Sequence, residues 1–191
     1  MSPSALLVRP ATRARWPDLE RLFGERGACG GCWCMAWRRP RSAWVAGKGA
    51  PNRAALRRLT ARRVPPGLLG YQGKEPVAWC AVAPRLEYPV LARSRVLRPV
   101  DDTPVWSVSC LFVRKDHRRR GIAAAMLEAA VRFAARHGGR VVEGYPVIPW
   151  ATKAPDTFLW TGTLASFQRA GFEEVARFSP ARPIVRAQCG S

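Results

Sequence analysis

The segment from residue 105 to residue 137 constrains the fold most strongly, because it joins the clearest strand to the clearest helix. Val105–Val113 is short and largely apolar, which is typical of a strand buried on both faces. Ile122–His137 places apolar residues at three- and four-residue spacing on one side and charged residues on the other. Only the basic turn 114–121 separates the two. A strand running through a short turn into an amphipathic helix indicates an α/β domain.

The rest of the chain continues this alternation. Asn52 is a plausible N-cap for a helix that ends near Arg62. The order of the elements predicts a mixed sheet with helices on both faces, and a length of 191 residues suits one domain spanning 1–191. Besides the segment above, we expect strands at 6–8, 67–71, 76–82, 141–147, 172–178 and 184–187, and helices at 17–25, 52–62 and 161–170.

The basic turn has the features of a phosphate-binding site. The first N–H groups of a helix have no partner within the helix, and the helix dipole adds positive potential there. Gly121 keeps side-chain atoms away from an approaching anion, and Ala123 leaves the first helical turn bare. Arg118, Arg119 and Arg120 bring positive charge beside these amides. The turn therefore predicts a site for a pyrophosphate.

At these residues the sequence resembles the GNAT superfamily of acyl-CoA N-acyltransferases. Residues 118–123 match the family's pyrophosphate motif, Arg/Gln-x-x-Gly-x-Gly/Ala, and 107–113 resembles its fourth strand. The run 167–172 is similar to the family's last helix entering its sixth strand. The resemblance implies a mixed, mostly antiparallel twisted sheet with helices on both faces, and acetyl-CoA as donor. It implies donor-binding roles for Leu111, Phe112, Val113, Arg118, Arg119, Arg120, Gly121, Ile122, Ala123 and Phe167.

Two positions depart from the family pattern. The family often has glycine where Arg119 stands, so the turn here has less conformational freedom. The family often has tyrosine where Phe167 stands, and that tyrosine commonly protonates the leaving thiolate. Phenylalanine has no proton to donate, so the usual acid is missing.

The function implied is transfer of an acetyl group from acetyl-CoA to a primary amine, in a ternary complex and without an acyl-enzyme. We expect a small-molecule amine as the acceptor. Three alternatives stay open: acetylation of a protein lysine or N-terminus, a non-catalytic sensor of acyl-CoA, and a nucleic-acid-binding module. The first alternative would require an open groove, which a sequence does not reveal.

Glu143 is the candidate base for deprotonating the amine, because an acid inside an apolar strand is costly unless it is used or paired. An ion pair with a basic residue and a solvent-facing position are the alternatives. Ser109 could hold a relaying water, and Tyr145 is the nearest replacement for the missing acid. The acids that could steer the amine are Glu143, Asp101, Asp102 and Asp156.

The run from Cys29 to Arg39 contains three cysteines and two tryptophans. Its glycines indicate a loop, and in GNAT-like proteins the region after the first helix typically shapes the acceptor pocket. We therefore expect Cys32, Trp33, Cys34 and Trp37 to wall that pocket, although packing in the core would explain the tryptophans equally well. A metal site needs about four ligands, and neither histidine has the spacing to complete one, so we expect no metal. A reactive thiol or a disulfide stays open.

The charge of the chain favours anionic ligands. Lys and Arg number 32 against 13 Asp and Glu, which gives a formal net charge of +19. The basic residues are scattered through every element and match no nucleic-acid-binding signature, which argues against nucleic acid as a partner. No segment is apolar enough to suggest a membrane span or a signal peptide, so we expect a cytoplasmic protein. Formation of a homodimer is left open.

Overall fold

The computed structural model describes residues 5–148 and 159–190. Within them, seven strands form one sheet in the order β1-β2-β3-β4-β5-β7-β6. Only β4 and β5 pair in parallel, and every other neighbouring pair is antiparallel. This confirms the predicted mixed, mostly antiparallel sheet. The strands are β1 Leu7–Pro10, β2 Gly67–Gln72, β3 Glu75–Pro84, β4 Trp106–Val113, β5 Val141–Gly144, β6 Glu173–Arg177 and β7 Pro183–Gln188.

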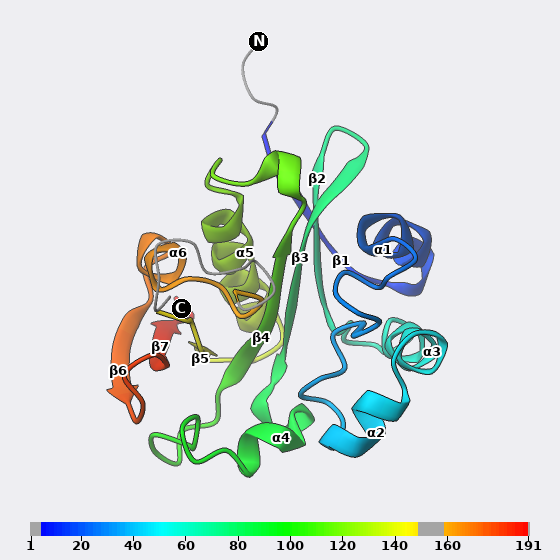
Figure 1. Cartoon of the computed structure of the whole chain (residues 1–191). Coiled ribbons are helices and arrows are strands. Elements are labelled where there is room, and N and C mark those ends of the chain that lie inside the picture. Colours follow the sequence, from blue (N-terminus) through cyan, green and yellow to red (C-terminus); the bar gives the residue numbers. More distant parts are fainter. Residues whose placement is uncertain (1–4, 149–158, 191) are drawn as a thin grey trace.

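Helices cover both faces of the sheet, as predicted: α5 and α6 lie on one face, and α1 and α3 lie on the other (Figure 1). The sequence did not predict α2 and α4, because α2 buries none of its residues and α4 is only four residues long. None of the described helices is long and apolar enough to cross a membrane. The helices are α1 Trp16–Phe23, α2 Arg41–Ala46, α3 Ala50–Leu59, α4 Pro89–Ala92, α5 Ile122–Arg136 and α6 Leu164–Arg169, with 3-10 turns at Arg13–Arg15, Arg85–Glu87 and Lys115–His117.

Two hydrophobic cores follow from the alternation of side chains along the strands. On β3, Cys80 belongs to the core that contains Met126 of α5. Its neighbour Trp79 belongs to the core that contains Leu19 of α1 and the cysteine run. The central strands are thus buried on both faces, which holds β4 rigidly between the two cores.

Among the described strands, none covers the edge of β4 beyond the point where β4 and β5 diverge. The two strands pair only through Trp106–Val108 and Val142–Gly144. Further along, the N–H of Leu111 donates to the carbonyl of Trp160 at 2.7 Å, whereas the N–H of Arg114 donates to β3. Because successive amides of a strand point to opposite edges, the N–H of Val113 points to the same side as that of Leu111.

Asn52 does not act as the predicted N-cap. Helix α3 begins at Ala50, and Asn52 lies inside it with no exposed surface. Its side-chain amide donates to the carbonyl of Trp44 at 3.0 Å and accepts a hydrogen bond from Arg39 at 3.1 Å. Asn52 therefore ties α2 and the loop before it to α3.

Candidate functional site

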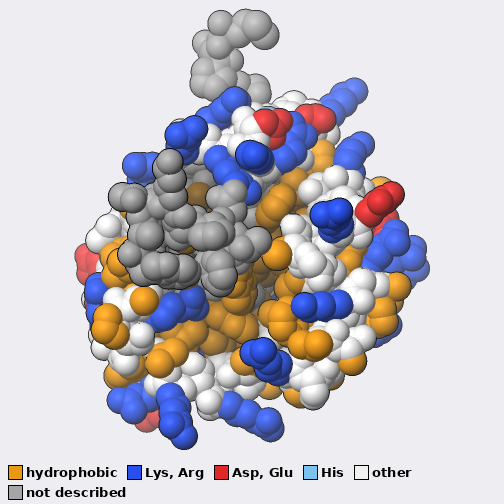
Figure 2. All heavy atoms as spheres, in the orientation of Figure 1, with side chains coloured by type: hydrophobic (Ala, Val, Ile, Leu, Met, Phe, Trp, Pro, Cys, Tyr) orange, Lys and Arg blue, Asp and Glu red, His pale blue; other side chains and the backbone are white. Residues whose placement is uncertain are grey.

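A cavity of about 770 Å³ opens at the carboxyl end of β4. Its walls come from four segments: the cysteine loop (residues 27–37) with the end of α2, β4 itself, the turn that leads into α5, and residues 159–169. Figure 2 shows hydrophobic side chains in the central hollow of this face, with Lys and Arg side chains around it. The cavity thus connects the predicted phosphate turn with the predicted acceptor loop.

The turn into α5 presents open backbone amides to the cavity. Gly121 is the N-cap, with a left-handed φ of 76°, and no side chain caps the helix. A Cβ at Gly121 would meet nothing within 4 Å, so the approach to the amides is clear. Arg118 donates from Nε to the carbonyl of Val113 at 3.0 Å, which fastens the turn to β4. Ile122 and Ala123 line the cavity at the first turn of α5.

The three arginines of the turn are placed differently. Arg118 and Arg119 line the cavity, whereas Arg120 is exposed and lies outside its lining. Arg119 has a φ of 60°, in the left-handed region that disfavours residues with a Cβ. The family's frequent glycine thus corresponds to the conformation observed here. His117 also lines the cavity, and its Nδ1 lies 2.9 Å from Asp116.

The thiols of the cysteine loop line the cavity, whereas the tryptophans of the loop pack behind its wall. Cys32 and Cys34 line the cavity, as do Leu111, Phe112 and Val113 of β4. Trp33 does not line it, because its ring is buried against Trp16 and Phe23 at centroid distances of 5.8 and 5.5 Å. Trp37 also lies outside the lining, and it packs behind the cavity-lining Trp160 at 5.0 Å.

The backbone of the cysteine loop is held in an unusual shape. Left-handed φ angles occur at Gly27, Ala28, Gly30, Gly31, Trp33 and Cys34. A Cβ at Gly27 would lie 2.3 Å from Nε1 of Trp33, and one at Gly31 would lie 2.5 Å from the backbone N of Gly49. The N–H of Gly49 in turn donates to the carbonyl of Gly31 at 3.0 Å. Close packing and these turns fix one wall of the cavity.

The thiols of Cys32 and Cys34 are kept protonated at neutral pH by their surroundings. Cys34 and Cys110 lie with their Sγ atoms 3.2 Å apart, and Trp79 donates to Cys34 at 3.1 Å. The hydrogen bond with Cys110, together with burial, raises the pKa of Cys34 well above its usual value. Burial raises the pKa of Cys32 to about 11. A protonated thiol is a weak nucleophile and a weak metal ligand, and in the described part of the chain no three metal-ligating side chains cluster.

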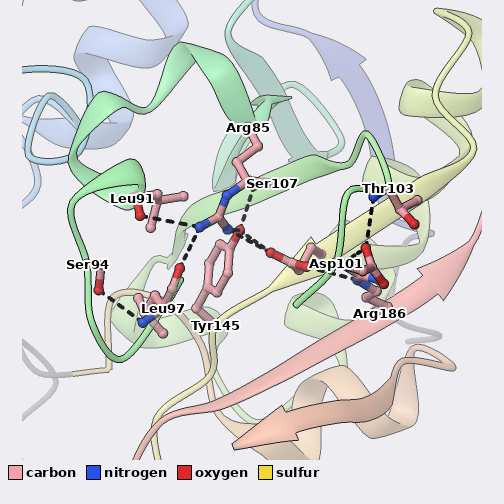
Figure 3. A network of polar contacts seen from close by, with 10 residues as sticks. Arg85, Leu91, Ser94, Leu97, Asp101, Thr103, Ser107, Tyr145 and Arg186 are labelled. Carbon is pink, nitrogen blue, oxygen red and sulfur yellow. Dashed lines mark hydrogen bonds and ion pairs between the residues drawn. The ribbon is translucent and has the colours of Figure 1, made fainter. Parts of the chain in front are cut away.

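Glu143 is buried in a polar network and does not belong to the cavity lining. Figure 3 shows other members of this network, among them Arg85, Tyr145 and Arg186. The Oε1 of Glu143 accepts hydrogen bonds from Arg85 at 2.8 Å and from Tyr145 at 2.6 Å. Its Oε2 accepts one from Arg186 at 2.9 Å, and Arg186 also pairs with Asp101. The side chain of Glu143 is 1% exposed, so Glu143 forms ion pairs within the protein and is not open to a substrate.

Tyr145 and Ser109 also lie outside the cavity lining. The hydroxyl of Tyr145 is 2.7 Å from that of Ser107, and burial beside Glu143 raises the pKa of Tyr145 well above its usual value. Ser109 is 3% exposed and shares a hydrogen bond with Tyr88. The hydroxyls of Tyr145 and Ser109 therefore form hydrogen bonds with other residues of the core.

Phe167, which was expected to contact the donor, does not line the cavity. It has no exposed surface, packs edge-on against Phe172 at 5.0 Å, and fills the space above Gly144. The neighbouring hydroxyls of Thr163 and Ser166 line the cavity instead. Thr163 caps α6, and its Oγ1 lies 2.9 Å from the Oγ of Ser166.

Sequence reasoning missed several lining residues. Thr163 had a readable signal, since a threonine before an apolar run is a common N-cap. Trp44 and Lys48 had none, because they reach the cavity only through the fold of α2 against the cysteine loop. Cys110 was hidden within an apolar strand.

Comparison with known proteins supports the family resemblance. The chain covers 89% of the GNAT domain of S. lividans PAT at 17% identity, with 95% of this chain aligned and a TM-score of 0.55. A GNAT-family acetyltransferase from Streptococcus agalactiae 2603 aligns with a TM-score of 0.57 at 13% identity, over 97% of this chain and 96% of that one. The Salmonella typhimurium protein yncA, whose structure contains its cofactor acetyl-CoA, aligns with a TM-score of 0.50 at 12% identity, over 98% and 95%.

These structural alignments establish a shared fold. A search of the curated proteins found no match. The model of the Acetyltransferase (GNAT) family matches residues 32–153, well over half of the chain. The chain therefore belongs to the GNAT family of acetyltransferases.

Proposed function

We propose that the chain transfers an acetyl group from acetyl-CoA to the amine of a small molecule, with both substrates bound at once. The observation that supports this most is the single cavity, which joins the phosphate turn to the cysteine loop across β4. Its volume of about 770 Å³ is typical of pockets for small molecules.

The donor would bind along the turn and along the carboxyl end of β4. The first amides of α5 and the guanidinium of Arg119 suit a pyrophosphate, and Arg169 of α6 adds positive charge to the same cavity. The N–H of Val113 points to the edge of β4 that β5 does not cover, where no described residue accepts from it, and an extended pantetheine arm would pair with it as an added strand does.

Direct transfer fits the chemistry of the lining better than an acyl-enzyme. The amine nitrogen forms a bond to the thioester carbon, the carbon–sulfur bond breaks as the tetrahedral intermediate collapses, and the proton lost by the nitrogen passes to the departing sulfur. The expelled thiol resembles cysteine, with a pKa of roughly 8.5, so it leaves without a strong acid. The hydroxyls of Thr163 and Ser166 are available to hydrogen-bond the departing sulfur. Cys32 and Cys34, held as thiols, are poor candidates for a covalent relay.

Calorimetric titration with acetyl-CoA tests the donor site. Ala123→Glu places a negative charge at the cavity wall without disturbing the left-handed turn. Ala125→Glu is the matched control, since Ala125 lies in the same helix outside the lining.

We expect the parent chain to bind, Ala123→Glu to bind at least about tenfold more weakly, and the control to bind normally. Failure of the parent chain to bind acetyl-CoA, or equal losses in both variants, would contradict the proposed donor site.

A further inference from the structure

The cavity is lined by basic residues and by no described acid. Lys48, Arg118, Arg119 and Arg169 belong to its lining, and no Asp or Glu of residues 5–148 and 159–190 does. Of the acids expected to steer an amine, Glu143 and Asp101 pair with arginines outside the lining.

Two further acids were expected near the amine. Asp102 is exposed and outside the lining, and Asp156 is outside the described residues. The described walls therefore offer no carboxylate partner to a second positive charge on the acceptor.

Lys48 stands apart from the other basic residues. The three arginines lie in the donor turn and on α6, whereas Lys48 follows α2 and adjoins Gly49, which is hydrogen-bonded to Gly31 of the cysteine loop. Its Nζ lies 5.0 Å from the ring centroid of Trp44, and no described carboxylate forms an ion pair with it. Lys48 thus places a positive charge on the acceptor wall, beside an aromatic surface.

We infer that the acceptor is a monoamine with an apolar body and a carboxylate, like an α-amino acid, and that Lys48 binds the carboxylate. This rests on the proposed function. The apolar body would pack against Trp44, Phe112 and Trp160, which line the same cavity. A diamine or polyamine would instead bring a second positive charge near Lys48, and no described carboxylate of the lining would pair with that charge.

Lys48 would also offset the effect of the carboxylate on the acceptor's amine. An α-carboxylate stabilises the ammonium form of the neighbouring amine, and pairing with Lys48 weakens that stabilisation. Lys48 would thereby favour the neutral form of an amine that Glu143, paired with Arg85 and Arg186, is not placed to deprotonate.

Thiol release from acetyl-CoA with matched pairs of acceptors tests the inference. Each pair consists of an apolar amino acid and its decarboxylated amine: phenylalanine with phenethylamine, tryptophan with tryptamine, and leucine with isoamylamine. Agmatine and spermidine represent the multiply charged amines. The proteins are the parent chain, Lys48→Glu, and the control Lys74→Glu, which makes the same charge change at an exposed residue outside the lining.

We expect the parent chain to favour at least one amino acid over its decarboxylated partner by about tenfold or more in kcat/KM. Lys48→Glu should reverse that preference and leave the KM for acetyl-CoA unchanged, and Lys74→Glu should behave as the parent does.

Turnover of only the decarboxylated or multiply charged amines would overturn the acceptor inference and leave acetyl transfer standing. An unchanged preference in Lys48→Glu would do the same. No thiol release from any amine, with acetyl-CoA bound, would count against both the inference and the proposed function.

Discussion

Replacement of Arg119 by glycine should stabilise the chain, although it removes a positive charge from the donor site. Arg119 has a φ of 60°. A left-handed backbone costs a residue with a Cβ roughly 1–2 kcal/mol, and glycine does not have this cost. Glycine also gains freedom in the unfolded chain, which offsets roughly 0.4–1 kcal/mol of that benefit. The net gain should be about 0.5–1 kcal/mol, or a rise in Tm of about 1–4 °C for a chain of this size.

Thermal unfolding and acetyl-CoA calorimetry separate the two effects. Arg119→Gly should raise Tm and weaken acetyl-CoA binding, whereas Arg119→Ala should weaken binding by a similar factor with little gain in Tm. Arg120→Gly is the control, because Arg120 is exposed and is not in the left-handed region. A Tm for Arg119→Gly at or below that of the parent chain, or a shift equal to that of Arg120→Gly, would refute the argument from backbone strain.

Four further predictions concern the core and the thiols. In Gly144→Ala the new Cβ would lie 2.0 Å from Cε1 of Phe167, so urea unfolding should show a loss of about 1–3 kcal/mol, partly recovered when Phe167→Leu is added. Glu143→Gln removes the carboxylate that pairs with Arg85 and leaves Arg186 with Asp101 alone, so it should cost about 3–5 kcal/mol; loss of kcat with normal stability would instead support the role of base. At mildly alkaline pH iodoacetamide should modify exposed Cys29 before Cys32, as peptide mass spectrometry would show. The pKa of Cys32 is raised from 9.0 to about 11 in the folded chain, so the unfolded chain loses this proton first as the pH rises. The free energy of unfolding should therefore be unaffected below pH 9 and should fall as the pH rises through 11.

The elements that could be predicted are those whose sequence pattern lies within a short stretch of the chain. The strand, basic turn and helix from 105 to 137 could be read from apolar spacing and from Gly121, and the sheet around them follows from short apolar runs separated by turns. The part of the cavity lining that comes from the turn, which is the proposed donor side, could be read with them, because a turn between a strand and a helix positions its own residues.

The acceptor side could not be read in the same way. Glu143 looked costly in an apolar strand, and only the folded chain brings Arg85 and Arg186 to it from 58 and 43 residues away. Phe167 matched a family position, yet its ring turns into the core because Gly144 leaves room for it. Lys48 reaches the cavity through α2, a helix without a buried face to mark it in the sequence.

The shape of the cysteine loop has a consequence for altering specificity by design. Gly27 and Gly31 sit where a side chain would clash with Trp33 or with the backbone of Gly49, and several other residues of the loop are already left-handed. Substituting one of these glycines would therefore disturb the whole wall before it altered selectivity. New acceptors are better sought by exchanging residues 27–37 as one cassette, together with the Gly49 backbone that anchors it. In a directed-evolution library, single substitutions at these glycines should mostly yield poorly folded chains, and multi-residue loop exchanges should supply the active variants.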